Sequence, residues 1–167
     1  MMVINIPSKV VTIGVYGFNE EQFFQSLLDA HVDLLCDVRQ RRGVRGAKYA
    51  FANSKRLQAR LELLGIDYIH LKELAPTVDI RNKQKEADKT QGIAKRKRTV
   101  LGETFRSAYK EEILQKVDFQ ELANKLGCHH KIIALFCVEK LPQACHRSLI
   151  AQRMAAEWNV KVEDIIP

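Results

Sequence analysis

The sequence predicts a single α/β domain of three layers, with a mostly parallel sheet of about four to five strands between helices on both faces. Short apolar runs rich in β-branched residues, such as residues 132–136, alternate with segments whose apolar residues recur at helical spacing. The first five elements read strand–helix–strand–helix–strand, the order of a parallel sheet with right-handed crossovers. A chain of 167 residues is also long enough to bury one core of its own.

The elements follow from these patterns in chain order. Strands, the last of them at an edge, are expected at residues 9–15, 32–38, 66–71, 132–136 and 160–166. Asn19 with Gln22 three residues later is typical of a capping box at the start of the first helix. Ser54 is expected to cap the second helix, and Gly65 to end it in the left-handed conformation.

A long polar segment interrupts the alternation. Residues 75–102 show no sustained apolar period, so we expect a basic polar insertion there that is either a lid or partly disordered. Apolar residues spaced four apart from Phe105 to Val117 then predict a helix, and Asp118 is placed to cap a further short one. No domain boundary is indicated, and one domain is expected over residues 1–167.

Basic residues are concentrated in two predicted loops. The chain carries a net charge of +7. Residues 79–98 hold eight Lys or Arg against three Asp or Glu, and residues 37–48 hold five against one. A solvated surface is the ordinary explanation of such runs. Both loops follow predicted strands and can flank one mouth, so we expect an anionic partner, either a small molecule or a nucleic acid.

Composition limits the class of protein. No apolar run approaches the roughly 20 residues of a membrane span, and the first residues lack the features of a signal peptide. Four cysteines in a chain of this length do not make a disulfide framework. Cys36 is expected to be buried in a strand, and Cys128 to be an incidental surface residue. We therefore expect a cytoplasmic protein that does not bind membranes, with cofactors and oligomeric state left open.

Groups suited to chemistry collect where one strand ends and a helix begins. The apolar strand at residues 132–136 leads into Cys137 and Glu139, and a helix with an apolar stripe is expected to begin near Cys145. The start of that helix carries further polar side chains, those of His146, Arg147 and Ser148. Ligands of open α/β sheets bind at such places, because free backbone N–H groups and the helix dipole favour an anion.

Several of these residues are candidates for catalysis. Cys145 lies where the helix dipole and neighbouring cations stabilise a thiolate nucleophile, and Cys137 is the second candidate. Each cysteine can instead be a small buried hydrophobe. Glu139 and Asp37, at two strand ends, can each act as a general base or hold an arginine in place, and structural pairing with Arg147 or Arg39 is the role we expect. His146 titrates in the useful pH range but can also cap the helix.

A second group of residues is suited to binding an anion. Arg39 and Arg147 are the candidate clamps, because a guanidinium offers a bidentate fork that lysine lacks. Ser148 adds a polar side chain at the start of the helix. His70 and Glu73, at the end of the third strand, can complete the pocket.

The two cysteines and His146 can instead be ligands of a zinc ion. The spacing C-x7-C-H is not that of a usual zinc motif. A fourth ligand would have to come from Asp37, Glu139 or His70. The sequence therefore predicts no metal site. A redox role for the cysteine pair is a further alternative, although the spacing of the two cysteines is far from the C-x-x-C of redox motifs.

Four segments resemble one known family. They read TIGVYGFNEEQF, LLCDVR followed by an arginine-rich loop, LGIDYIHLKELA, and LFCVEKLPQACHRSLIA. In this order they are similar to the domain of unknown function 488 family, and the C-x-E…C-H-R-S ending is the most specific part. The resemblance implies an α/β domain with signature residues at strand ends. These fall on Gly14, Asp37, Arg39, His70, Leu71, Glu73, Cys137, Glu139, Cys145, His146 and Arg147.

Two functional hypotheses follow. The favoured one is an enzyme that acts on an anionic substrate through the Cys/Glu/His/Arg cluster at strand carboxyl ends. This substrate would carry phosphate or carboxylate groups, and it could be a nucleic acid. The alternative is a non-catalytic nucleic-acid-associated protein that binds through its two basic loops. Both require that distant segments meet at one edge of the sheet.

Overall fold

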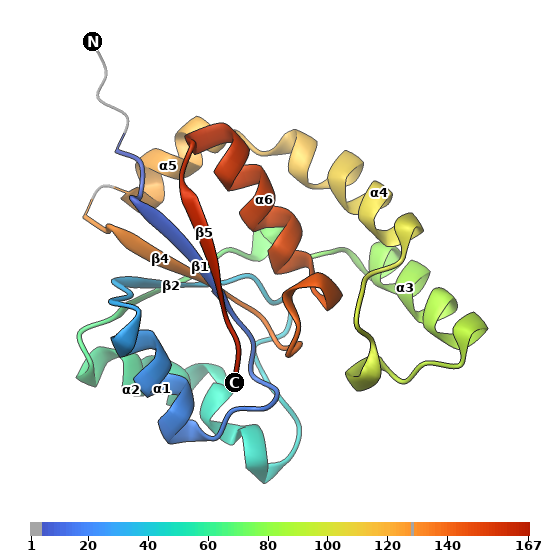
Figure 1. Ribbon diagram of the computed structural model, residues 1–167, viewed down its shortest axis with the longest axis horizontal. Helices are drawn as coiled ribbons and strands as arrows, with labels where there is room; N and C mark the ends of the chain where they lie inside the picture. Colours follow the sequence, from blue (N-terminus) through green and yellow to red (C-terminus); the bar gives the residue numbers. More distant parts are fainter. Residues whose placement is uncertain (1–4, 128) are drawn as a thin grey trace.

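A five-stranded parallel sheet forms the centre of the part of the chain that the structure describes. The computed structural model describes residues 5–127 and 129–167, apart from the side chain of residue 96. The strands are β1 (Lys9–Ile13), β2 (Leu34–Asp37), β3 (Asp67–His70), β4 (Ile132–Phe136) and β5 (Lys161–Ile165). Their order is β3-β2-β4-β1-β5, with every pairing parallel (Figure 1). The predicted sheet and its last edge strand are confirmed.

Helices cover both faces of the sheet and complete the predicted three layers (Figure 1). One face carries α1 (Glu20–Asp29) and α2 (Ser54–Leu63), and the other carries α4 (Glu103–Glu112), α5 (Phe119–Gly127) and α6 (His146–Trp158). Side chains of one strand alternate between the two cores. In β4, Leu135 joins the core under α6, whereas Phe136 joins the core under α1 and α2.

Two of the predicted helix starts are confirmed. Oδ1 of Asn19 accepts a hydrogen bond from the backbone N–H of Gln22 at 2.8 Å, and Oε1 of Gln22 accepts one from the backbone N–H of Asn19 at 3.2 Å. Oδ1 of Asp118 accepts two backbone N–H groups at the start of α5, each at 3.0 Å. Within the described residues, no helix combines the length and the apolar character needed to cross a membrane.

Two predicted boundaries are wrong. The cap of α2 is Asn53, and Ser54 is already helical. The loop before α2 occupies the Asn53 side chain, whose Oδ1 accepts from the backbone N–H of Val44 at 2.7 Å. The helix predicted to run to Val117 stops earlier, since α4 ends at Glu112 and a tighter 3-10 turn follows, which places Leu114 in the core.

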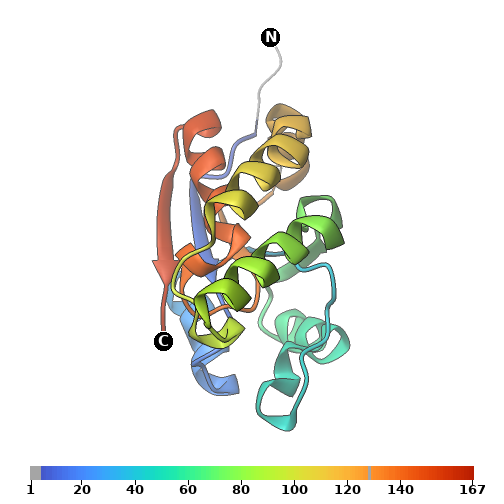
Figure 2. The same ribbon diagram turned by 90° about the vertical axis from the view of Figure 1, so that its right-hand side faces the viewer.

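The polar segment at residues 75–102 contains a helix that the sequence pattern did not predict. This is α3 (Val78–Gln91), and it lies alongside α4 (Figures 1 and 2). Thr77 caps it, since its Oγ1 accepts from the backbone N–H of Ile80 at 3.2 Å. Its buried side chains are those of Ile80 and Gln84, so the helix has no apolar stripe from which to predict it.

The carboxyl ends of β1, β2 and β4 meet beside the amino end of α6, because β4 lies between the other two strands. Gly14 follows β1 at a point of close approach. A Cβ atom there would lie 1.9 Å from the carbonyl oxygen of Glu139 and 3.2 Å from Nη1 of Arg147. Only glycine leaves room for this contact between the strand end and the loop after β4.

Replacing Gly14 by Ala is therefore expected to destabilise the protein by about 3 kcal/mol, because the loop after β4 must move away from β1. Gly43→Ala is the matched control, since a Cβ atom there has its nearest neighbour at 3.8 Å. The control should change the free energy of unfolding by less than about 0.5 kcal/mol. Urea unfolding measures the free energy of unfolding of both variants. Equal midpoints for the two variants would contradict the close approach at Gly14.

Candidate active site

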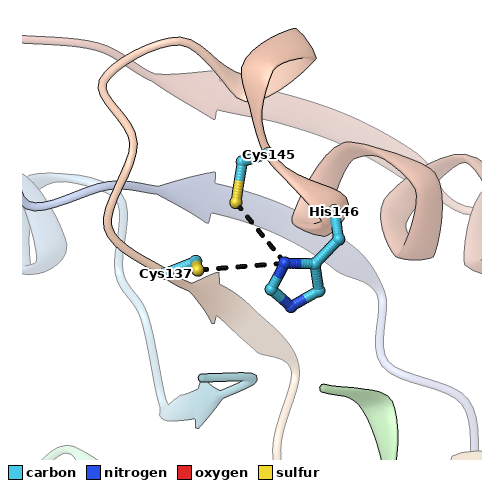
Figure 3. A group of neighbouring side chains, drawn as sticks. All are labelled: Cys137, Cys145 and His146. Atoms are coloured by element: carbon cyan, nitrogen blue, oxygen red, sulfur yellow. Dashed lines mark hydrogen bonds between the residues drawn. The ribbon is translucent and has the colours of Figure 1, made fainter. Parts of the chain in front are cut away.

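Cys137, Cys145 and His146 lie together at this edge of the sheet (Figure 3). Cys137 follows β4, Cys145 is the residue before α6, and His146 is its first residue. The sulfurs of Cys137 and Cys145 lie 3.9 and 3.8 Å from Nδ1 of His146. All three residues are buried. We call them the thiol–imidazole cluster.

A backbone carbonyl fixes the orientation of the His146 ring. Nε2 lies 2.8 Å from the carbonyl oxygen of Val38, at the end of β2. Since a carbonyl oxygen only accepts hydrogen bonds, Nε2 carries a proton. Nδ1 faces both sulfurs and is left to accept a proton from a thiol. The Tyr109 ring packs edge-on against the imidazole, with 5.6 Å between ring centroids, and holds it from the α4 side.

The two thiols of the cluster differ in acidity. Burial acts to raise the pKa of Cys145. The hydrogen bond from Cys137 and the positive charges of His146 and Arg147 outweigh burial, and they hold that pKa well below the value of an ordinary cysteine. The pKa of Cys137 is raised by its hydrogen bond to Cys145 and by burial. Cys145 is therefore the more acidic thiol of the pair, and Cys137 is the one that donates the hydrogen bond between them.

Glu139 places a carboxyl group close to this pair. Its side chain is 7% exposed, and within the described part of the chain its Oε1 has no hydrogen-bond partner. Nζ of Lys95 and Nη2 of Arg98 each lie 3.8 Å from Oε1. Burial and then the charge of Cys145 raise the pKa of Glu139 against the opposing effect of these cations. A buried carboxyl with a raised pKa is suited to general acid chemistry.

Arg147 is fully buried and holds the loop between β4 and α6. Its Nη1 donates to the carbonyl oxygen of Glu139 at 2.6 Å, and its Nη2 to that of Lys140 at 3.2 Å. The predicted pairing of Arg147 with the Glu139 carboxylate is wrong, because the arginine binds the main chain of that residue instead. Ser148 also binds the main chain, since its Oγ donates to the carbonyl oxygen of Cys145 at 2.9 Å.

Asp37 and Arg39 form a buried ion pair at the end of β2. Nε and Nη2 of Arg39 donate to the two carboxylate oxygens at 2.9 and 2.8 Å, and Nη1 donates to the Ala52 carbonyl at 2.9 Å. The Tyr68 hydroxyl donates to Oδ2 of Asp37 at 2.6 Å. This is the structural pairing with Arg39 that the sequence predicts for Asp37. Nε2 of His70 lies 2.6 Å from the Arg39 carbonyl oxygen, so the end of β3 joins the same network.

A cavity of about 630 Å³ opens beside the thiol–imidazole cluster, whose three residues line it. Both basic segments of the sequence contribute to its wall, one from the loop after β2 and the other from α3 and the turn after it. Seven Lys or Arg side chains and two acidic ones are among its described lining residues, namely Arg39, Arg41, Arg45, Arg81, Lys85, Lys95, Arg98, Asp88 and Glu139. The cavity is therefore strongly basic.

The structure separates some predicted site residues from this cavity. Of the predicted anion-binding residues, Arg39 is among the described residues that line it. Glu73 lies elsewhere, exposed on the surface and 3.5 Å from Nζ of Lys125, because the short turn after β3 directs it away from the strand ends. Cys36 is buried in β2 as predicted. The prediction for Cys128 falls outside the described residues.

Two arginines of the cavity were not among the predicted site residues. Arg98 donates through Nη1 to Asp88 at 2.7 Å and through Nη2 to the Ala144 carbonyl at 3.2 Å. Nε of Arg98 and Nε of Arg81 are buried without a hydrogen-bond partner among the described residues. The basic run at residues 79–98 was the signal for them, but it does not tell which of its members face inward.

One known family matches the chain. The family model of the domain of unknown function DUF488 matches residues 19–154. The chain belongs to this DUF488 family. The match spans the strands β2, β3 and β4 and the whole thiol–imidazole cluster, and it confirms the resemblance found in the sequence. A search of curated proteins found no match for the DUF488 chain.

Cys145 is expected to be the fast-reacting thiol of this DUF488 protein. An ordinary cysteine, with a pKa of about 8.5, reacts slowly with iodoacetamide at pH 6. Because the pKa of Cys145 is lowered, peptide mass spectrometry should find it labelled about 10-fold faster than free cysteine at that pH. The fast phase should vanish in Cys145→Ser and persist in Cys36→Ala. Labelling no faster than that of free cysteine would contradict the thiolate assignment.

Glu139→Gln is expected to stabilise the DUF488 protein at high pH only. The pKa of Glu139 is raised in the fold, so the stability of the native chain falls as pH rises from the unfolded pKa of about 4.3 through the folded one. Glutamine has no charge to bury. Midpoints of urea unfolding should agree at pH 4, and the variant should have the higher midpoint at pH 8. A lower midpoint for the variant at pH 8 would show that the ionised carboxylate is favoured.

Proposed function

We propose that this DUF488 protein is an enzyme that uses Cys145 as a nucleophile on an anionic substrate. One observation carries the proposal. Sγ of Cys145 lies at the amino end of α6, 3.8 Å from Nδ1 of His146, in the wall of a cavity to which the described residues contribute seven cationic side chains. A nucleophile beside a base that a third group orients, here the Val38 carbonyl, is the arrangement of thiol catalysis. The basic wall favours a substrate with phosphate or carboxylate groups.

The proposed reaction begins with the Cys145 thiolate, whose proton has passed to Nδ1 of His146. Sγ forms a bond to a carbonyl carbon or phosphorus of the substrate, and the bond from that atom to the leaving group breaks. The Glu139 carboxyl gives its proton to the leaving group. Water then cleaves the covalent intermediate, gives one proton to the Glu139 carboxylate, and restores the Cys145 thiolate.

The cavity wall supplies the binding groups in this proposal. Arg81 and Arg98 line the cavity and bring positive charge to it, although the Nε atom of each is itself buried and lacks a hydrogen-bond partner in the described structure. The side-chain nitrogens of Arg39 donate to Asp37 and to the Ala52 carbonyl, and both terminal nitrogens of Arg147 donate to main-chain oxygens, so these two arginines contribute positive potential. A cavity of about 630 Å³ is of small-molecule size, since such sites span about 300–1,000 Å³.

A non-catalytic nucleic-acid-binding role is the second candidate. Arg41 and Arg45 are exposed on one side of the cavity, and Lys85 and Lys95 are exposed on the other. Basic side chains on two sides of a groove suit a phosphate backbone. Binding of this kind would weaken steeply with added salt and would be unchanged by Cys145→Ser.

Inorganic phosphate is a probe for the proposed substrate site. Phosphate should slow the alkylation of Cys145 in a saturable way, because phosphate and the alkylating reagent compete for the same cavity. Arg81→Gln and Lys95→Gln should each raise the half-protecting concentration about 10-fold, since a charge-assisted hydrogen bond is worth about 1.5–3 kcal/mol. Lys55→Gln, which removes the same charge from an exposed position on α2, should leave it unchanged.

Absence of protection by phosphate, or equal weakening by Lys55→Gln, would contradict the proposed substrate site. Anisotropy of a labelled single-stranded oligonucleotide, measured between about 50 and 200 mM salt, tests the second candidate. Tight and steeply salt-dependent binding that Cys145→Ser does not alter, together with a slowly reacting Cys145, would favour nucleic-acid binding over catalysis.

A further inference from the structure

The thiol–imidazole cluster has the composition of a metal site. Cys137, Cys145 and His146 each offer one ligand atom, and these three atoms lie within 4.8 Å of one another. Thiolates and imidazole are the ligands that Zn²⁺ prefers. We propose that the cluster binds one Zn²⁺ ion and leaves one coordination position toward the cavity. The ion would share Cys145 with the proposed nucleophile, but its binding does not depend on the proposed reaction.

The distances in the cluster fit a tetrahedral ion. Zn–S bonds of about 2.3 Å and a Zn–N bond of about 2.0 Å at tetrahedral angles separate sulfur from nitrogen by about 3.5 Å. The two sulfurs lie 3.9 and 3.8 Å from Nδ1 of His146. A contraction of about 0.3–0.4 Å therefore brings both pairs to the distances of a bound ion, and small side-chain rotations supply it. The spacing C-x7-C-H does not show this fit, because the loop between the cysteines folds back on itself.

The surroundings of His146 are those of a metal-binding imidazole. Histidine ligands usually donate their second ring N–H to a carbonyl or carboxylate, which fixes the ring and directs the other nitrogen at the ion. The Val38 carbonyl, 2.8 Å from Nε2, has this role here. The ligands and their support come from the end of β4, the start of α6 and the end of β2, so three packed elements hold the site in place.

The fourth position is left toward the cavity, whose wall includes Glu139. Glu139 is not among the three residues whose ligand atoms lie within 4.8 Å of one another, so its carboxylate belongs to the surroundings of the ion. The other two ligands that the sequence offered are engaged elsewhere. Asp37 binds Arg39 and Tyr68, and Nε2 of His70 lies 2.6 Å from the Arg39 carbonyl oxygen.

The charge balance permits a dication in a basic cavity. Zn²⁺ bound by two thiolates is neutral, so the surrounding arginines oppose it far less than they would oppose a bare ion. A Cys145 thiolate bound to Zn²⁺ is a weaker nucleophile than a free thiolate, because the ion draws electron density from the sulfur. Zinc would therefore act as a reversible inhibitor of the proposed enzyme, and a chelator would restore the reactive thiolate.

Direct titration tests the site. Protein carrying Cys128→Ser is stripped of metal and titrated with Zn²⁺ against a chromogenic chelator. We expect one ion per chain, and X-ray absorption should show two sulfur ligands at about 2.3 Å and at least one nitrogen at about 2.0 Å. Cys137→Ser, Cys145→Ser and His146→Ala, made in this background, should each weaken binding at least about 100-fold. Cys36→Ala, which removes the thiol buried in β2, should leave binding unchanged.

The outcomes separate this proposal from the proposed reaction. Cys128→Ser protein that binds no Zn²⁺ in the titration, an absorption spectrum without sulfur ligands, or equal binding when Cys137→Ser and Cys145→Ser are added together overturns the metal site. The spectrum of the unmutated cluster decides even where a variant fails to fold. Alkylation of metal-free protein is measured in parallel. Fast alkylation without Zn²⁺ binding rejects the metal site alone, and Zn²⁺ binding with slow alkylation of the metal-free thiol rejects the nucleophile alone.

Discussion

The candidate site depends on the hydrogen bonds that the buried guanidinium of Arg147 makes. It donates from α6 to two carbonyl oxygens of the loop that joins β4 to this helix. Gly14 leaves room for the same loop against the end of β1. Because the loop is folded back at this point, Cys137 before it and Cys145 at its end reach one imidazole. A buried charge that loses its partners is costly, so the loop has little freedom to rearrange.

The site gathers groups that a protein interior ordinarily avoids. Cys145, a thiol of lowered pKa, and Glu139, a carboxyl of raised pKa, line the same cavity. The carboxyl of Glu139 also leaves a buried oxygen without a hydrogen-bond partner in the described structure. Such groups reduce stability. Two apolar cores, one on each face of the sheet, offset that cost. Perturbed groups that line a cavity are more typical of a functional site than of a structural one.

Positive charge reaches the cavity from segments that are far apart in the chain. The helix α3 brings Arg81 although it buries few apolar side chains, so other contacts must hold it in place. One of these is Arg98, which joins Asp88 of α3 to the Ala144 carbonyl in the turn before α6. The same arginine lies 3.8 Å from the Glu139 carboxylate. Substrate binding and zinc binding, as proposed, therefore draw on one network.

The sequence by itself determined the layers, the strands and most helix starts, because hydrophobic period and capping side chains are local signals. It also placed Cys137, Glu139 and Cys145 at one edge, since parallel strands end on the same side of a sheet. The helix α3 escaped prediction for want of an apolar stripe. Only the tertiary structure decided that Arg147 binds carbonyl oxygens and that both sulfurs face Nδ1 of His146. Such contacts depend on the angles at which separate elements pack, and no local pattern in the chain records those angles.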